Sequence, residues 1–175
     1  MCRTECLPRK ELYEAWEVAR RARRRFRGGR VVDLACGHGL VAHLMLLLDD
    51  TSPIAHAVDT RIPASAATVA AELVRTWPRI AGRVVFEERP LAGMALGPDD
   101  VVVSVHACGA LTDDVLDAAI QARTRVVVLP CCQVAARSPL FRAASPPTAA
   151  TRAARIASPL GRPPMALRAS SMAFA

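Results

Sequence analysis

The sequence has no apolar run long enough to cross a membrane. Its longest apolar stretches, such as residues 44–48 and 101–105, fall far short of the roughly 20 residues that a spanning helix needs. The N-terminus also lacks the basic start and apolar core of a signal peptide. We therefore expect a cytoplasmic protein whose six cysteines are reduced thiols.

Acidic residues are absent from residues 136–175, although six of the 23 basic residues lie there. All 16 acidic residues lie in residues 1–135, where they nearly balance the remaining basic residues, so most of the net charge of +7 belongs to the tail. The tail is rich in Ala, Arg, Pro and Ser and has little periodic apolar pattern. This composition predicts a disordered or loosely packed segment that follows one domain at 1–135.

A second arginine-rich segment lies inside the domain, at residues 20–30. Its seven arginines are Arg20, Arg21, Arg23, Arg24, Arg25, Arg27 and Arg30. Two interpretations remain open. The arginines form the solvated carboxyl end of a helix, where cations suit the helix dipole, or they contact phosphate groups. The second interpretation would give a weak, salt-sensitive contact with nucleic acid.

The apolar pattern indicates alternating helices and strands. A first helix is expected at 8–26, with Leu12, Trp16, Ala19 and Phe26 buried. Strands are expected at 30–34, 54–58, 83–86, 101–106 and 125–129, and helices at 39–48, 64–77 and 112–122. Strands that are continuous Val/Ile/Leu runs separated by helices predict an α/β, Rossmann-like, doubly wound parallel sheet in three layers.

The first strand runs into a glycine turn, from Asp33 to Gly39, that opens a helix. Such a turn offers free N–H groups and the positive end of a helix dipole, which suits a nucleotide-type ligand. One interpretation is a dinucleotide site, because Gly37 begins a formal G-x-G-x-x-A pattern and Asp59 follows Gly39 by 20 residues. Another is a purely structural turn in which Asp33 caps backbone N–H groups.

Asp33 favours a third interpretation, since a dinucleotide fold ordinarily has an apolar residue there. A carboxylate near the end of an apolar strand needs a partner, and the cationic methionine part of S-adenosylmethionine supplies one. The turn resembles the first motif of class I S-adenosylmethionine-dependent methyltransferases, with Ala35 in place of the usual first glycine. The resemblance implies that Asp33, Gly37 and Gly39 hold the methionine end and that Asp59 holds the ribose.

The resemblance also implies the rest of the cofactor site. A polar residue after the third strand would lie near the adenine, and Glu87 or Glu88 is the candidate. The complete set of expected cofactor-binding residues is Asp33, Ala35, Cys36, Gly37, His38, Gly39, Asp59 and Glu87. His43 and His56 are interpreted as structural positions.

The fourth and fifth strands end in His-Ala-Cys-Gly at 106–109 and Pro-Cys-Cys at 130–132. These endings resemble a methyltransferase-domain family that includes the glutathione S-transferase C-terminal-domain-containing proteins. In an open α/β sheet the carboxyl ends of the strands face the ligand crevice. We therefore expect His106, as a general base or orienting group, and Cys108 to border the methyl-transfer site. A structural histidine that hydrogen-bonds neighbouring backbone is the open alternative for His106.

The cysteines allow three interpretations. A thiolate of Cys131 or Cys132 would attack a pyrimidine ring, as in carbon-5 methyltransferases. Alternatively, His106, Cys108, Cys131 and Cys132 would bind zinc, although adjacent cysteines suit a tetrahedral site poorly and no C-x-x-C motif occurs. Buried, unreactive thiols are the simplest reading, and we expect no metal.

The two strands that normally end a class I methyltransferase sheet are not recognisable in residues 138–175, so we expect them to be missing or degenerate. The sequence predicts S-adenosylmethionine-dependent methyl transfer to RNA, protein or a small molecule. The alternative is a non-catalytic nucleotide-binding or RNA-binding domain.

Overall fold

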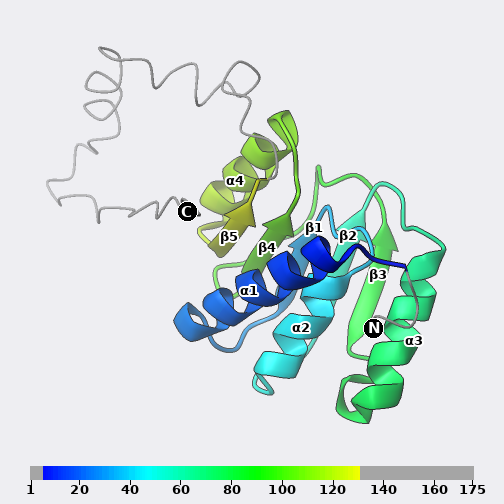
Figure 1. The fold of residues 1–175 in the computed structure, drawn as a ribbon. Helices are drawn as coiled ribbons and strands as arrows, with labels where there is room; N and C mark the ends of the chain where they lie inside the picture. Colours follow the sequence, from blue (N-terminus) through cyan, green and yellow to red (C-terminus); the bar gives the residue numbers. More distant parts are fainter. Residues whose placement is uncertain (1–5, 131–175) are drawn as a thin grey trace, which may run out of the picture.

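The computed structural model describes residues 6–130, which form one sheet flanked by helices (Figure 1). The elements in chain order are α1 (Arg9–Arg25), β1 (Val31–Leu34), α2 (Leu40–Leu48), β2 (Ala55–Asp59), α3 (Ser65–Thr76), the 3₁₀ turn η1 (Pro78–Ile80), β3 (Val84–Glu88), β4 (Val101–Val105), α4 (Ala110–Ala122) and β5 (Arg125–Leu129). Every expected helix and strand is present, with bounds that agree to within two residues. Cys131, Cys132 and the tail at 136–175, with its expected missing strands, lie outside the described residues.

The five strands are all parallel, in the order β3-β2-β1-β4-β5. The chain winds outward from β1 to β3 and then returns to the other side of β1 for β4 and β5. This confirms the doubly wound, Rossmann-like α/β sheet. The strand order reverses between β1 and β4, and open α/β sheets bind ligands at the carboxyl ends of the strands at such a point.

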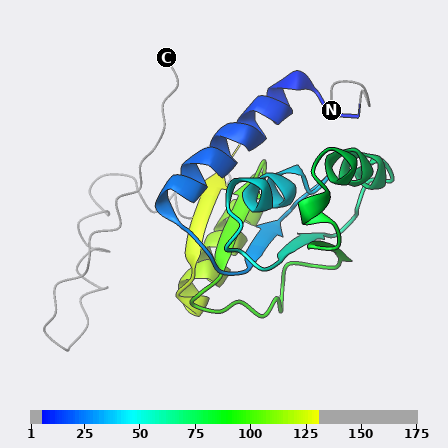
Figure 2. The ribbon, with the colours of Figure 1, turned by 90° about the horizontal axis from the view of Figure 1, so that it is seen from below.

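Helices cover the sheet on both faces (Figure 2). On one face α1, α2 and α3 pack over residues such as Val31, Ala57 and Val103. On the other face Val115 of α4 and apolar residues of the loop 89–100 pack over Val32, Leu34, Val58 and Val102. Because the strands are buried on both faces, they read as apolar runs rather than as alternating patterns.

Helix α1 differs from expectation in its buried face. Ala15, Val18, Ala19 and Ala22 are buried, while Trp16, expected in the core, is 45% exposed. The small alanines let the α1 backbone approach α2 closely, and a tryptophan at that contact would hold the helices apart. Leu12 and Phe26 pack at the edge of the core, as expected.

Arg23 is also buried, against the expectation of a wholly solvated arginine segment. Its guanidinium donates to Met45 O at 2.9 Å and Ser52 Oγ at 2.7 Å, and lies 3.2 Å from Asp49 Oδ2. Burial lowers the pKa of Arg23 to about 10, while the charge of Asp49 opposes that shift. The neighbouring Arg24, Arg25 and Arg27 are exposed, as a solvated helix end requires.

Among the helices of residues 6–130, none has the length and apolar character that a membrane span requires.

Candidate cofactor site

Asp33 lies at the base of the candidate site and is buried in the sheet. Its Oδ2 atom accepts a hydrogen bond of 3.0 Å from the backbone N–H of Ala42, in the first turn of α2. Burial raises the pKa of Asp33 to about 7; the Ala42 hydrogen bond opposes this rise and the charge of Asp59 adds to it. Asp33 therefore does cap a backbone N–H group, and it also places a titratable carboxyl directly beneath the glycine turn.

The turn itself depends on left-handed backbone conformations. Ala35, Gly37 and Gly39 have φ values of 58°, 51° and 66°. A Cβ atom on Gly39 would lie 2.7 Å from the ring of Phe86 in β3, so only glycine fits at this position. A Cβ on Gly37 would meet nothing within 4 Å, which leaves the backbone of Gly37 facing open space. Ala35, where the methyltransferase motif usually has glycine, adopts this conformation at a cost of about 1–2 kcal/mol.

Asp59 joins this turn to the end of β2. Its Oδ2 atom accepts a 2.9 Å hydrogen bond from Gly37 N–H, and the N–H of Cys36 donates to Val58 O at 3.1 Å. Asp59 and Asp33 thus approach the turn from two neighbouring strands. The structure brings together the residues that the first motif and the acid of the second strand predicted.

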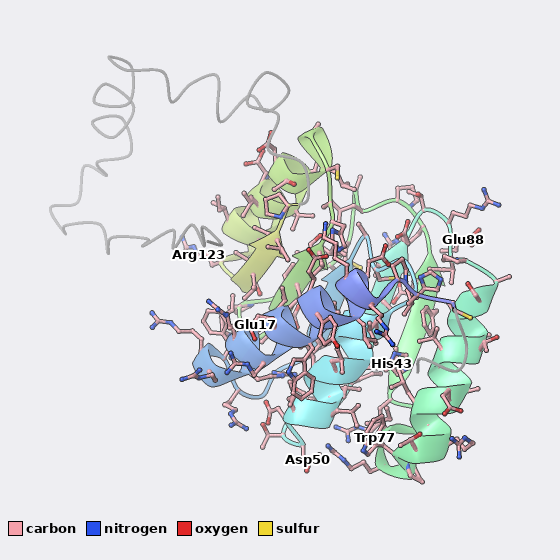
Figure 3. All side chains as sticks on the ribbon, in the orientation of Figure 1. Glu17, His43, Asp50, Trp77, Glu88 and Arg123 are labelled. Atoms are coloured by element: carbon pink, nitrogen blue, oxygen red, sulfur yellow. The ribbon has the colours of Figure 1, made fainter. Side chains whose placement is uncertain are left out.

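The two glutamates at the end of β3 point to opposite faces of the sheet, because side chains alternate along a strand. Glu88 is paired in register with Asp59, and its Oε2 accepts a hydrogen bond of 3.0 Å from Ile62 N–H. Figure 3 shows Glu88 at the carboxyl end of the strand. Glu87 lies on the other face, where it contacts the imidazole of His56. Glu88, rather than the expected Glu87, lies on the face of Asp59.

Two histidines support the turn. His38 Nε2 lies 2.9 Å from the hydroxyl of Ser65, at the start of α3. His43 is a buried residue of α2, labelled in Figure 3, and its Nδ1 lies 2.7 Å from Gly39 O. Burial lowers the pKa of His43, so its neutral ring donates the Nδ1 proton to that carbonyl. The sequence predicted a structural role for His43 but did not indicate its hydrogen bond to the carbonyl of Gly39.

His106 follows β4 and also has a left-handed backbone, with φ 68°. Its N–H donates to Leu129 O at 2.9 Å, and its Nε2 lies 3.1 Å from Glu14 Oε2 of α1. The contact with Glu14 has no counterpart in the sequence pattern, since the two residues belong to distant elements.

The cysteines of the described residues offer no reactive thiolate at this site. Cys108 is exposed and disulfide-bonded, so the expectation of a reduced thiol is wrong for this residue. Cys36 is a free thiol whose pKa is raised, first by burial and then by the charges of Asp33 and Asp59. Within residues 6–130, no three His, Cys, Asp or Glu side chains are grouped so that they could hold a metal ion.

Comparison with known proteins identifies the family. A sequence-family profile described as "Methyltransferase domain" matches residues 10–138, and the chain therefore belongs to this methyltransferase-domain family. No curated protein matches the sequence. The likeness to glutathione S-transferase C-terminal-domain-containing proteins stays a prediction.

Solved structures show the same fold. An O-methyltransferase family protein from Burkholderia thailandensis is similar with a TM-score of 0.50 and 21% identity, over 71% of this chain and 39% of that one. A candidate RNA methyltransferase from Pyrococcus horikoshii is similar with a TM-score of 0.52 and 18% identity, over 71% of this chain and 63% of that one. The chain thus matches between about two fifths and two thirds of the length of these proteins.

Proposed function

We propose that this chain binds S-adenosylmethionine at the carboxyl ends of β1 and β2 and transfers its methyl group to an acceptor. The observation that carries the proposal is the convergence of two acids on one glycine turn, with Asp33 buried beneath the turn and Asp59 bound to Gly37 N–H. A ligand that carries positive charge next to a ribose matches both acids. Membership of the methyltransferase-domain family supports the same cofactor.

The residues present fit this cofactor. The backbone of Gly37 faces open space that a side chain would fill, and the α2 N-terminus lies directly behind it. Asp33 is buried, so it acts on the methionine end through its negative charge and by fixing the turn to α2. Asp59 would accept hydrogen bonds from the ribose hydroxyls, and Glu88, paired with it in register, would hold the adenine side.

The bound cofactor supplies the reactive methyl group, and the protein contributes alignment in a crevice. The turn fixes the methionine end, and β2 and β3 fix the nucleoside. His106 follows β4, the strand next to β1 on the other side of the switch point, and so borders the space that an acceptor would enter.

Binding measurements test this proposal. Calorimetry on the full chain should show selective binding of S-adenosylmethionine and S-adenosylhomocysteine over NAD, because NAD would place its negatively charged pyrophosphate at the glycine turn, where ionised Asp33 repels it. Tighter binding of NAD would instead support the dinucleotide interpretation and refute the methyltransferase proposal.

A second candidate activity is contact with nucleic acid through the solvent side of α1. Spacings of three and four residues place Tyr13, Trp16, Arg20 and Arg24 along one side of the helix. Tyr13 is 69% exposed, and exposed aromatic rings beside arginines suit stacked bases and phosphates. We infer that this surface gives a weak, salt-sensitive contact with single-stranded nucleic acid.

A further inference from the structure

Glu14 and His106 are far apart in sequence but meet in the structure. Glu14 Oε2 lies 3.1 Å from His106 Nε2, and both atoms are excluded from solvent. The side chains as wholes are 28% and 31% exposed, so the buried contact adjoins surface that an acceptor can reach. This polar contact is an ion pair only when the imidazole is protonated. We propose that Glu14 positions His106 to accept the acceptor's proton during methyl transfer, an inference that rests on the function proposed above.

The backbone at His106 supports this assignment. A φ of 68° is uncommon for a residue with a side chain, and such conformations persist where the surrounding structure enforces them, often at functional sites. Here the N–H of His106 donates to Leu129 O of β5, which holds the chain as it leaves β4. The turn carries the imidazole to the side of the sheet on which α1 and Glu14 lie.

The position of His106 relative to the cofactor turn follows from the sheet. β4 pairs with β1, with Val103 opposite Asp33. Both strands end at the same edge, so His106 follows β4 next to the turn that follows β1. This is the switch point at which the strand order reverses, where an acceptor and a cofactor in this fold would meet.

The chemistry of the pair follows from charge. The carboxylate of Glu14 favours a proton on Nε2 of His106, so Nδ1 of the neutral ring holds the lone pair. In the transfer, the lone pair of the acceptor atom forms the bond to the methyl carbon. The carbon–sulfur bond breaks with its electron pair left on sulfur, and the acceptor's proton passes to Nδ1. Glu14 then stabilises the imidazolium, as an orienting carboxylate does beside other catalytic histidines.

Glu14→Ala tests this role, with Glu11→Ala as a control that removes the same charge from the preceding turn of α1. All variants should bind S-adenosylhomocysteine like the wild type in calorimetry, since neither residue is in the cofactor site. Transfer of labelled methyl groups from S-adenosylmethionine to a cell extract should fall roughly tenfold or more in Glu14→Ala and not in Glu11→Ala. Glu14→Gln, which keeps a hydrogen-bond acceptor, should recover part of the rate. Equal rates in Glu14→Ala and wild type would overturn the inference.

A second measurement needs neither cofactor nor acceptor, so it separates this inference from the proposed function. Nitrogen NMR of the full chain with labelled histidine reports which ring nitrogen carries the proton, and a His106→Asn variant identifies the signals. At alkaline pH, wild-type His106 should carry its proton on Nε2, and Glu14→Ala should show an increased share of the Nδ1–H form. An unchanged tautomer in Glu14→Ala would overturn the inference even if the cofactor binds. Failure of the wild type to bind cofactor would overturn the proposed function instead.

Discussion

The carboxylate of Asp59 accepts a 2.9 Å hydrogen bond from the backbone N–H of Gly37, so the end of β2 fixes the turn that follows β1. One acid therefore serves two purposes. It shapes the glycine turn in the free protein through Oδ2, and its Oδ1 atom, which accepts long hydrogen bonds of 3.4 Å from Thr60 Oγ1 and from the N–H of Arg61, is the acceptor proposed for the ribose.

Replacing Asp59 by alanine should weaken cofactor binding. The variant loses charge-assisted hydrogen bonds to the ribose, worth about 1.5–3 kcal/mol each, which corresponds to a roughly ten- to hundredfold weaker affinity. Calorimetry with S-adenosylhomocysteine measures this loss. Asp117→Ala, which removes an exposed carboxylate from the middle of α4, is the matched control and should leave the affinity unchanged. Unaltered binding in a folded Asp59→Ala protein would remove Asp59 from the site.

Asp33 should make folding stability depend on pH. Its folded-state pKa, about 7, is raised above the ordinary 3.8, so the folded protein holds this proton more tightly than the unfolded chain. The contribution of Asp33 to stability is therefore fully present at acid pH below 3.8 and declines until the pH passes about 7. Asp33→Asn should abolish this decline and melt at an equal or higher temperature than wild type above neutral pH. Scanning calorimetry at several pH values between about 4 and 8 measures the melting temperatures of both proteins. An Asp33→Asn variant that is less stable than the wild type at alkaline pH contradicts the prediction.

The same carboxyl should make cofactor affinity rise with pH. Ionised Asp33 attracts the cationic methionine end and protonated Asp33 does not, so wild-type affinity should increase as the pH passes about 7. The Asp33→Asn variant should bind more weakly above neutral pH and show a flatter dependence. Titrations with S-adenosylmethionine at several pH values compare the two proteins. Parallel curves for both would exclude Asp33 as the source.

Alanine at the two glycines of the turn should separate folding from binding. Gly39→Ala places a Cβ 2.7 Å from the ring of Phe86 and should destabilise the fold by about 1–3 kcal/mol beyond the cost of its positive φ. Gly37→Ala meets no neighbour and should cost only about 1–2 kcal/mol in stability while blocking cofactor. Gly82→Ala, with φ 70° and open surroundings before β3, controls for backbone strain alone. Denaturant unfolding and calorimetry give both quantities, and tight cofactor binding by Gly37→Ala would argue against the proposed site.

The surface of α1 should bind nucleic acid only weakly and without sequence preference. Fluorescence anisotropy with labelled single-stranded RNA should show an affinity that falls steeply as salt rises, because arginine–phosphate contacts release counterions. The Tyr13→Ala and Arg24→Ala variants should bind this RNA more weakly than the wild type at the same salt concentration, while Asp117→Ala should bind it equally well. Salt-resistant, sequence-selective binding would contradict this and point to RNA as a specific acceptor.

The sequence predicted the strands well because each is an apolar run in a sheet buried on both faces. It also singled out Asp33 and Asp59, since a polar residue at the end of such a run stands out, and the structure brings both to one turn. Their role as cofactor ligands stays a prediction. It could not choose between Glu87 and Glu88, because that choice depends on strand register, which pairs Glu88 with Asp59. Arg23 follows Ala19 by four residues, and this spacing places both on the buried face of α1. The charge of the arginine side chain made a buried position look improbable from the sequence. The Glu14 contact depends on tertiary packing alone.

Arg23 has a consequence for the opposite end of its helix. Its guanidinium is bound to Asp49, Met45 and Ser52 at the far end of α2, so α1 can neither slide nor rotate without breaking a buried ion pair. Glu14 lies nine residues earlier, about 13 Å along the same rigid rod. The Arg23–Asp49 salt bridge thus fixes the position of α1, and with it the position of the Glu14 carboxylate. The alignment of His106 therefore depends on a salt bridge that is remote from the reaction.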